Sequence, residues 1–160
     1  MSLLTGTVSL IQLDNIYLAV SGGDTLMIGQ SSEVKVLKKG GKKVGSFDYA
    51  GTELPAYCLN DQLLPSQDNS LLEQSQFCIG LKTSQEADYF VLLCQSFEQV
   101  DLAEKSHNMR ELPVFMCNEN MLAQGMLEYR NIVYLVTSAD KVIDYIANGA
   151  DHKQENKKNA

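Results

Sequence analysis

Short apolar stretches, each bounded by turn residues, are the feature of this chain that most restricts its fold. They are four to six residues long and rich in β-branched and aromatic residues, which is typical of β-strands. Glycine-containing turns separate the first strand from the second, the third from the fourth and the fourth from the fifth. Many short strands in close succession predict sheets that close into barrels or form a sandwich. The predicted strands are residues 16–21, 25–30, 33–37, 46–49, 54–59, 77–81, 89–94, 113–117 and 132–137.

One convincing helix is predicted near the C-terminal end of the sequence. Ser138 can cap its first turn, and Gly149 would end it. Residues 65–76 are polar at both ends and predict a connection with one helical turn that joins two halves of the chain. Residues 149–160 offer almost nothing to bury, which predicts a disordered tail. The apolar stripe expected on the helix consists of Val142, Ile143, Ile146 and Ala147.

The two halves of the sequence resemble one another. Shifted by 80 places, Gly45-Ser-Phe-Asp-Tyr49 matches Gly125-Met-Leu-Glu-Tyr129. A shift of 65 places aligns Gln30, Ser31 and Glu33 with Gln95, Ser96 and Glu98. A repeat of this kind predicts two similar small barrels, and the groove between them is then a natural binding place.

Charge and hydropathy exclude several classes of function. The chain has 160 residues, about one domain, and a formal net charge of −7, which disfavours binding to nucleic acid or to anionic membranes. The longest apolar run, 89–94, is far shorter than the roughly 20 residues of a membrane span. The first basic residue is Lys35, so the basic start of a secretory signal is missing. We therefore expect a cytoplasmic protein without membrane insertion, whose partner is another protein or a small molecule.

No pattern in the sequence indicates an active site, a metal site or a cofactor. The four cysteines are spaced by 20, 16 and 23 residues, which matches no zinc or redox motif and favours reduced, buried thiols. Of the two histidines, His152 lies in the tail and His107 in a polar stretch that predicts a loop. Scattered carboxylates such as Asp48 and Glu98 could act as acids or bases only in a dry cleft. The cysteines in question are Cys58, Cys78, Cys94 and Cys117.

Residues 45–63 (GSFDYAGTELPAYCLNDQL) resemble the signature of the CheW-like family. In that family a glycine opens a strand, a second glycine makes the turn, and a proline starts a strand that leads into a short leucine-containing helix. Other landmarks follow in the family's order, and the resemblance covers about residues 13–147. These landmarks are the opening hairpin at 17–28, the strands from Phe90 to Leu102, Leu112-Pro113, Gln124-Gly125-Met126, and Ile132-Val-Tyr-Leu-Val before the final helix.

The resemblance implies a mainly β fold of two five-stranded SH3-like β-barrel subdomains, related by a pseudo-two-fold axis, with a C-terminal helix. The domain would span residues 1–148, with one subdomain at roughly 15–70 and the other at roughly 76–147. Members of the family are non-enzymatic adaptors that couple the cytoplasmic tips of chemoreceptors to a CheA-type histidine kinase, in chemotaxis or in pilus-based motility. Two other classes stay open: a two-barrel module that binds a small ligand and has no kinase partner, and an enzyme that uses scattered carboxylates.

The resemblance places receptor contacts near the 47–54 hairpin, while kinase-binding residues stay unassigned. Alternation puts Phe47 and Tyr49 on one face of the strand and Asp48 and Ala50 on the other. The family commonly has Arg at the position of Ala50, Asp at that of Cys58 and an acid at that of Lys35. These departures predict a weakened or redirected receptor contact. The expected receptor-binding residues are Lys35, Val36, Asp48, Ala50, Gly51 and Leu54.

Overall fold

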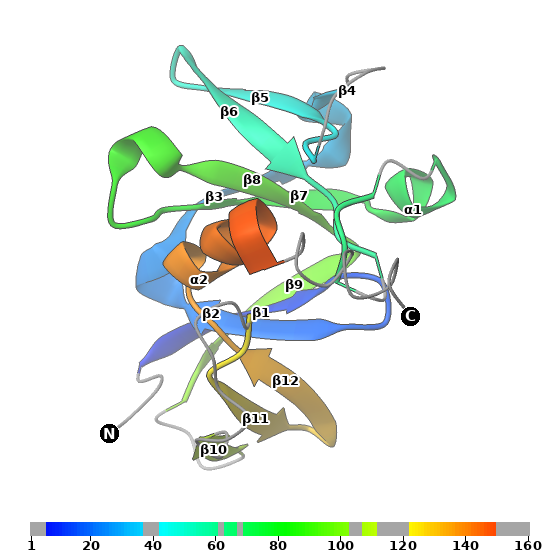
Figure 1. Cartoon of the computed structure of the whole chain (residues 1–160). Helices are drawn as coiled ribbons and strands as arrows, with labels where there is room; N and C mark the ends of the chain where they lie inside the picture. Colours follow the sequence, from blue (N-terminus) through cyan, green and yellow to red (C-terminus); the bar gives the residue numbers. More distant parts are fainter. Residues whose placement is uncertain are drawn as a thin grey trace.

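The chain forms two six-stranded sheets with a short helix between them (Figure 1). The computed structural model describes residues 6–36, 42–60, 63–66, 69–102, 107–111 and 122–149, and for residues 69, 107–111 and 149 the backbone alone. Sheet A has the order β10 (His107–Glu111), β11 (Gly125–Tyr129), β12 (Ile132–Val136), β2 (Tyr17–Ser21), β1 (Thr7–Gln12) and β9 (Ser96–Asp101). Sheet B has the order β3 (Thr25–Gln30), β7 (Phe77–Leu81), β8 (Phe90–Cys94), β6 (Thr52–Tyr57), β5 (Gly45–Tyr49) and β4 (Lys35–Val36).

Strand order confirms that the chain consists of two repeats. Sheet B read backwards, from β4 to β3, matches sheet A read from β10 to β9, so that β1 to β6 correspond to β7 to β12. Each sheet has one parallel pair among its described strands, β12·β2 in sheet A and the equivalent β6·β8 in sheet B. The other pairs are antiparallel. The mainly β, two-sheet architecture with a C-terminal helix is therefore as predicted. Each sheet has six strands among the described residues instead of five, because short edge strands such as β4 are added.

The 80-place match is confirmed, and the 65-place match is wrong. Gly45 and Gly125 begin equivalent strands, and Tyr49 and Tyr129 end them. Gln30, however, is the last residue of β3, whereas Gln95 lies between β8 and β9. The position equivalent to Glu98 is Met27, because these two residues face Leu10 and Gly80 on the neighbouring strands.

The two repeats exchange strands between the sheets. The first repeat contributes β1 and β2 to sheet A and its other strands to sheet B, while β7 and β8 of the second repeat lie in sheet B. Each sheet therefore combines strands from both of the ranges 15–70 and 76–147, and β1 lies outside both ranges. The predicted connection between them contains α1 (Asn69–Gln74), which is the expected helical turn.

Several predicted element boundaries need correction. The strand expected at 33–37 is reduced to β4, because a 3₁₀ turn occupies Ser31–Glu33. The backbone of His107 lies in β10 and not in a loop. Strands β1, β9, β10 and β11 were not among the predicted strands, and the predicted strand 113–117 and Cys117 lie outside the described residues. Further 3₁₀ turns lie at Gly22–Asp24 and Glu86–Asp88.

The core of the described residues has three parts. One cluster lies on sheet A and includes Val8 and Leu127, and another, around Phe47 and Val91, belongs to sheet B. The third lies between the sheets and beneath α2 (Ala139–Asp144). The place where a groove between two barrels was expected therefore contains packed side chains of both sheets, among them Leu18 of sheet A.

The C-terminal helix begins as predicted, and its α-helical part ends at Asp144. Ser138 accepts a hydrogen bond from the Lys141 amide at 3.2 Å. After Asp144 the backbone widens into a π-helical turn over Tyr145–Gly149. Because a π turn holds more residues, Ala147 is rotated to the surface, and Tyr145 packs inward and donates to the Leu63 carbonyl at 2.8 Å. The predicted stripe is therefore correct at Val142 and Ile146 and wrong at Ala147.

Candidate functional site

The β5–β6 hairpin presents one acidic, exposed face and one buried face. Phe47 and its cross-strand partner Leu54 are 6% and 4% exposed and pack in the core of sheet B. Asp48 lies opposite Glu53, and both side chains are exposed. The alternation read from the sequence is therefore confirmed at Phe47 and Asp48. Leu54, expected at a receptor contact, is a core residue whose side chain is not available at the surface.

The tip of this hairpin requires a left-handed backbone at two residues. Ala50 has φ of 49° and Gly51 has φ of 85°. Two successive residues with positive φ are typical of the type I′ turn, whose twist matches that of the flanking strands. Glycine adopts this conformation without strain, whereas alanine is strained by roughly 1 kcal/mol. Both residues are exposed at the tip.

The edge strand β4 lies beside this hairpin. Lys35 pairs with Ser46 and Val36 with Gly45, and both side chains of β4 are exposed, Val36 by 60%. A Cβ atom at Gly45 would collide with the carbonyl oxygen of Lys35, so the close approach of β4 needs glycine there. The fold thus brings five of the six expected receptor-contact positions onto one exposed edge.

Of the three departures from the family pattern, only two lie on the surface. Ala50 and Lys35 are exposed. Cys58 is 1% exposed, and its thiol lies 3.9 Å from the Ser75 hydroxyl in the core of sheet B. Its replacement of Asp therefore concerns packing and not a surface contact.

The equivalent hairpin of sheet A, β11–β12, carries different side chains. Its turn residues Arg130 and Asn131 also have positive φ, 51° and 66°. The Arg130 guanidinium donates to the Glu98 carboxylate at 3.1 Å and lies 4.9 Å from the centre of the Tyr129 ring. Val133, on the outer face, is 51% exposed. Arginine is thus present at the position equivalent to Ala50.

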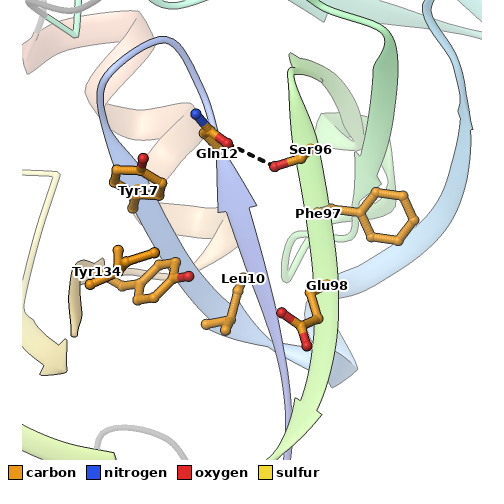
Figure 2. A pocket seen from close by; sticks show the side chains of 8 residues that line it. Leu10, Gln12, Tyr17, Ser96, Phe97, Glu98 and Tyr134 are labelled. Atoms are coloured by element: carbon orange, nitrogen blue, oxygen red, sulfur yellow. Dashed lines mark hydrogen bonds between the residues drawn. The ribbon is translucent and has the colours of Figure 1, made fainter. Parts of the chain in front are cut away.

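A hollow of about 200 Å³ opens beside this hairpin on the face of sheet A that carries Leu10, Tyr17 and Tyr134. Figure 2 shows Tyr17 and Tyr134 on one side of it, Leu10 on the central strand, and Glu98 on the far side. The two tyrosine rings contact each other edge to face, with centres 5.6 Å apart. The lining residues come from β12, β2, β1 and β9: Leu10, Gln12, Tyr17, Ser96, Phe97, Glu98, Ile132 and Tyr134.

The polar groups of the hollow differ in how they are satisfied. The Ser96 hydroxyl donates to the Gln12 side-chain oxygen at 2.9 Å. The Tyr134 hydroxyl has no hydrogen-bond partner within the described part of the chain. Burial, and then the negative charge of Glu98, raise the pKa of Tyr134 above its usual value of 10, so its O–H stays protonated and can donate.

The described cysteines are buried and reduced, as predicted. Burial is the largest cause that raises the pKa of Cys78 to about 11 and that of Cys94 to about 12. Among the described residues, no three His, Cys, Asp or Glu side chains are grouped so that they could hold a metal ion. No helix in the described ranges is both long and apolar enough to cross a membrane.

Sequence reasoning singled out Ser96 as a repeat match and Glu98 as a repeat match and a scattered carboxylate, and it did not predict the hollow. Its lining residues lie on four strands whose positions in the chain range from Leu10 to Tyr134. Only the strand exchange between the repeats brings them together, and no local pattern reports that exchange. The match between Tyr49 and Tyr129 showed that the chain contains a repeat, but it did not show that the repeats exchange strands.

Comparison with known proteins supports the fold through structure and not through sequence. No family model matches the chain, and no curated protein sequence matches it. The scaffolding protein TtCheW from Thermoanaerobacter tengcongensis has a similar crystal structure, with a TM-score of 0.60 over 91% of this chain and 95% of that chain, at 11% sequence identity. A likeness at this identity concerns the fold. The chain therefore has the CheW-like fold that its sequence landmarks predicted.

Proposed function

We propose that this protein is a cytoplasmic, non-enzymatic signalling adaptor that couples the cytoplasmic tips of chemoreceptors to a CheA-type histidine kinase, in chemotaxis or pilus-based motility. The observation that carries the proposal is the structural likeness to a CheW scaffolding protein over nearly the whole length of both chains. An adaptor needs exposed edges and rigid hairpins more than a catalytic cleft. The β4 edge and the β5–β6 hairpin supply such a surface.

Affinity capture from the native cytoplasm tests this function. Tagged protein should recover a histidine kinase, and the purified kinase and a receptor-tip fragment from the same cell should each bind the purified protein in calorimetry. A capture that contains neither partner, followed by no measurable binding of either purified component, would overturn the proposal.

Substitution at the hairpin tip tests the location of the receptor contact. Ala50→Arg would supply a long, forked donor at an exposed tip, the side chain that the equivalent position of sheet A already has. A new charged interaction at an interface is worth about 2 kcal/mol, or roughly thirtyfold in affinity. Calorimetry with the receptor fragment should therefore show tighter binding by the variant. If Ala50→Arg and Asp48→Arg both bind like the wild-type protein, the hairpin is not the receptor surface.

One observation favours the second candidate, a small-ligand-binding module without a kinase partner. The hollow in sheet A is large enough for a small molecule and combines tyrosine rings with a carboxylate. Specific ligand binding by a protein that shows no affinity for kinase or receptor would favour this candidate over the adaptor.

A further inference from the structure

The hollow of sheet A has an apolar floor and an aromatic wall. Leu10, 2% exposed, forms the floor, and Tyr17 and Tyr134 stand on one side of it, on the next two strands β2 and β12. Ile132 adds a further apolar surface. A cavity of about 150 Å³ with aliphatic and aromatic walls accommodates benzene, so a hollow of about 200 Å³ has room for one small ring or a short alkyl chain.

A carboxylate faces the aromatic wall across this floor. Glu98 lies directly opposite Leu10 in the β1–β9 register. Its present partner is Arg130, but the two side chains are 48% and 65% exposed, and an ion pair so open to water contributes at most about 1 kcal/mol. Arg130 can therefore leave Glu98 at little cost when another cation arrives.

The equivalent place in sheet B is closed by the protein itself. There Met27 replaces Glu98 and Gly80 replaces Leu10. A Cβ atom at Gly80 would lie 2.5 Å from the Met27 sulfur, which shows that the methionine lies directly over the glycine. In sheet A the equivalent side chain carries a charge and pairs with Arg130, and a hollow lies beside it.

We propose that the hollow of sheet A is a binding site for a small organic cation, an ammonium group on a short apolar stem. The ammonium would take the place of the Arg130 guanidinium at Glu98, and the stem would pack on Leu10 and Ile132. The tyrosine faces attract cations, and the net charge of −7 favours a cationic ligand over an anionic one. This site is separate from the β4 and β5–β6 edge, and the proposal does not rest on the adaptor function.

Titration with 2-phenylethylamine, followed by amide chemical shifts and calorimetry of the full chain, tests the site. The neutral 2-phenylethanol and the anionic 3-phenylpropanoate are matched probes that keep the ring and change the charge. The amine should shift the amides of Leu10, Tyr17 and Ile132 and bind about tenfold more tightly than the alcohol, and the anion should bind least. Equal affinity for amine and alcohol, or shifts elsewhere on the molecule, would overturn the proposal.

Variants of the ion pair give effects of opposite sign. Glu98→Gln keeps the shape and removes the charge, so amine affinity should fall about tenfold. Arg130→Gln removes the competing cation, so amine affinity should rise severalfold. Glu53→Gln is the matched control, because it removes another exposed carboxylate from a strand of sheet B and should leave binding unchanged. If Glu98→Gln and Glu53→Gln have equal effects, the general charge of the protein and not the hollow attracts the amine.

A third variant tests the hollow without relying on charge. Glu98→Met copies Met27 of sheet B and should cover the floor. It should abolish binding of the neutral alcohol as well as that of the amine, while circular dichroism stays that of the wild-type protein. Retained binding of the alcohol would place it outside the hollow and would overturn the assignment of the site.

Discussion

The two equivalent hairpins of this molecule share a backbone and differ in their chemistry. Both turns hold two successive residues with positive φ, Ala50-Gly51 in sheet B and Arg130-Asn131 in sheet A. The left-handed turn is thus a requirement of the repeated fold. The fold does not fix the side chains of the turn in the same way. Ala50 has no polar side chain, whereas Arg130 donates a hydrogen bond to Glu98 on the far edge strand of its sheet. Two copies of one scaffold therefore offer different surfaces to partners.

The two sheets also differ in the side chains at equivalent positions of their strands. In sheet B, Met27 lies over Gly80. In sheet A, Leu10 replaces the glycine, and the charged Glu98 pairs with Arg130. Sheet A has a hollow at this place, next to its hairpin.

The largest expected effect comes from removing equivalent core side chains. Phe47 and Leu127 hold matching positions and are both buried. Phe47→Ala and Leu127→Ala should each lower the free energy of unfolding by about 3 kcal/mol or more. Because the repeats exchange strands, each variant should still unfold in a single transition in denaturant. Two separate transitions would show that the sheets fold independently.

Alkaline pH should lower the free energy of unfolding through two buried thiols of sheet B, Cys78 on β7 and Cys94 on β8. Their thiols ionise near pH 9 in the unfolded chain, while burial raises the folded pKa values to about 11 and about 12. Above pH 9 the unfolded state therefore loses protons that the folded state keeps, and the free energy of unfolding falls as pH rises toward 11 and 12. The slope for Cys94 is at most about 1.4 kcal/mol per pH unit.

Urea unfolding at pH 8, 9 and 10 measures this slope. Tyrosines with raised pKa values act in the same direction only above pH 10, so the range below it reports on the thiols. The double variant Cys78→Ala and Cys94→Ala should flatten the curve between pH 9 and 10. An equal slope in the double variant would assign the effect to other groups.

Two glycines of sheet B should differ in their tolerance of a methyl group. Gly45→Ala drives a Cβ into the backbone carbonyl of Lys35, so β4 must separate from β5, at a cost of about 2 kcal/mol. Gly80→Ala meets the end of the flexible Met27 side chain, which can rotate away, so we expect about half that cost. Thermal unfolding of the two variants checks the order. The reverse order would mean that the β4 edge is not held in place.

The smallest expected effect is a rise in stability from a change at the hairpin tip. Asparagine tolerates a left-handed backbone better than alanine does, so Ala50→Asn should stabilise the fold by about 0.5–1 kcal/mol. The matched control Asp48→Asn, on extended backbone two residues earlier, should change little. A loss of stability in Ala50→Asn would contradict the turn conformation.

Sequence reasoning succeeded where burial follows a local pattern. Strands β3 and β7 were predicted with their observed bounds, because their apolar residues form an uninterrupted run between turns. Strand β9 was not predicted from its own residue pattern, because most of its side chains are exposed. In β1 the run is broken by Ser9, which is fully buried and shares a 2.8 Å hydrogen bond with Thr25.

Some features of the candidate sites also follow from a local sequence pattern, and others do not. The outward direction of Asp48 follows from alternation within one strand, and the structure confirms it. The inward direction of Leu54 follows from its pairing with Phe47 across the turn, which a single strand does not reveal. The hollow depends on strands brought together by the exchange between repeats. Its empty space depends on the side chains at two equivalent pairs of positions, Met27 and Gly80 in sheet B and Glu98 and Leu10 in sheet A. Neither is encoded in a short segment.

The strand exchange also sets the order in which the chain can fold as it leaves the ribosome. Strand β1 pairs with β2 at once but meets β9 only after Asp101 has been synthesised, and β2 meets its parallel neighbour β12 only after Val136. Pairings between such distant residues are slow, because a long loop must close before they contribute. Both outer edges of the first hairpin therefore stay unpaired until Asp101 has been translated, and its β2 edge until Val136. During this interval the nascent chain is most exposed to aggregation and depends most on chaperones.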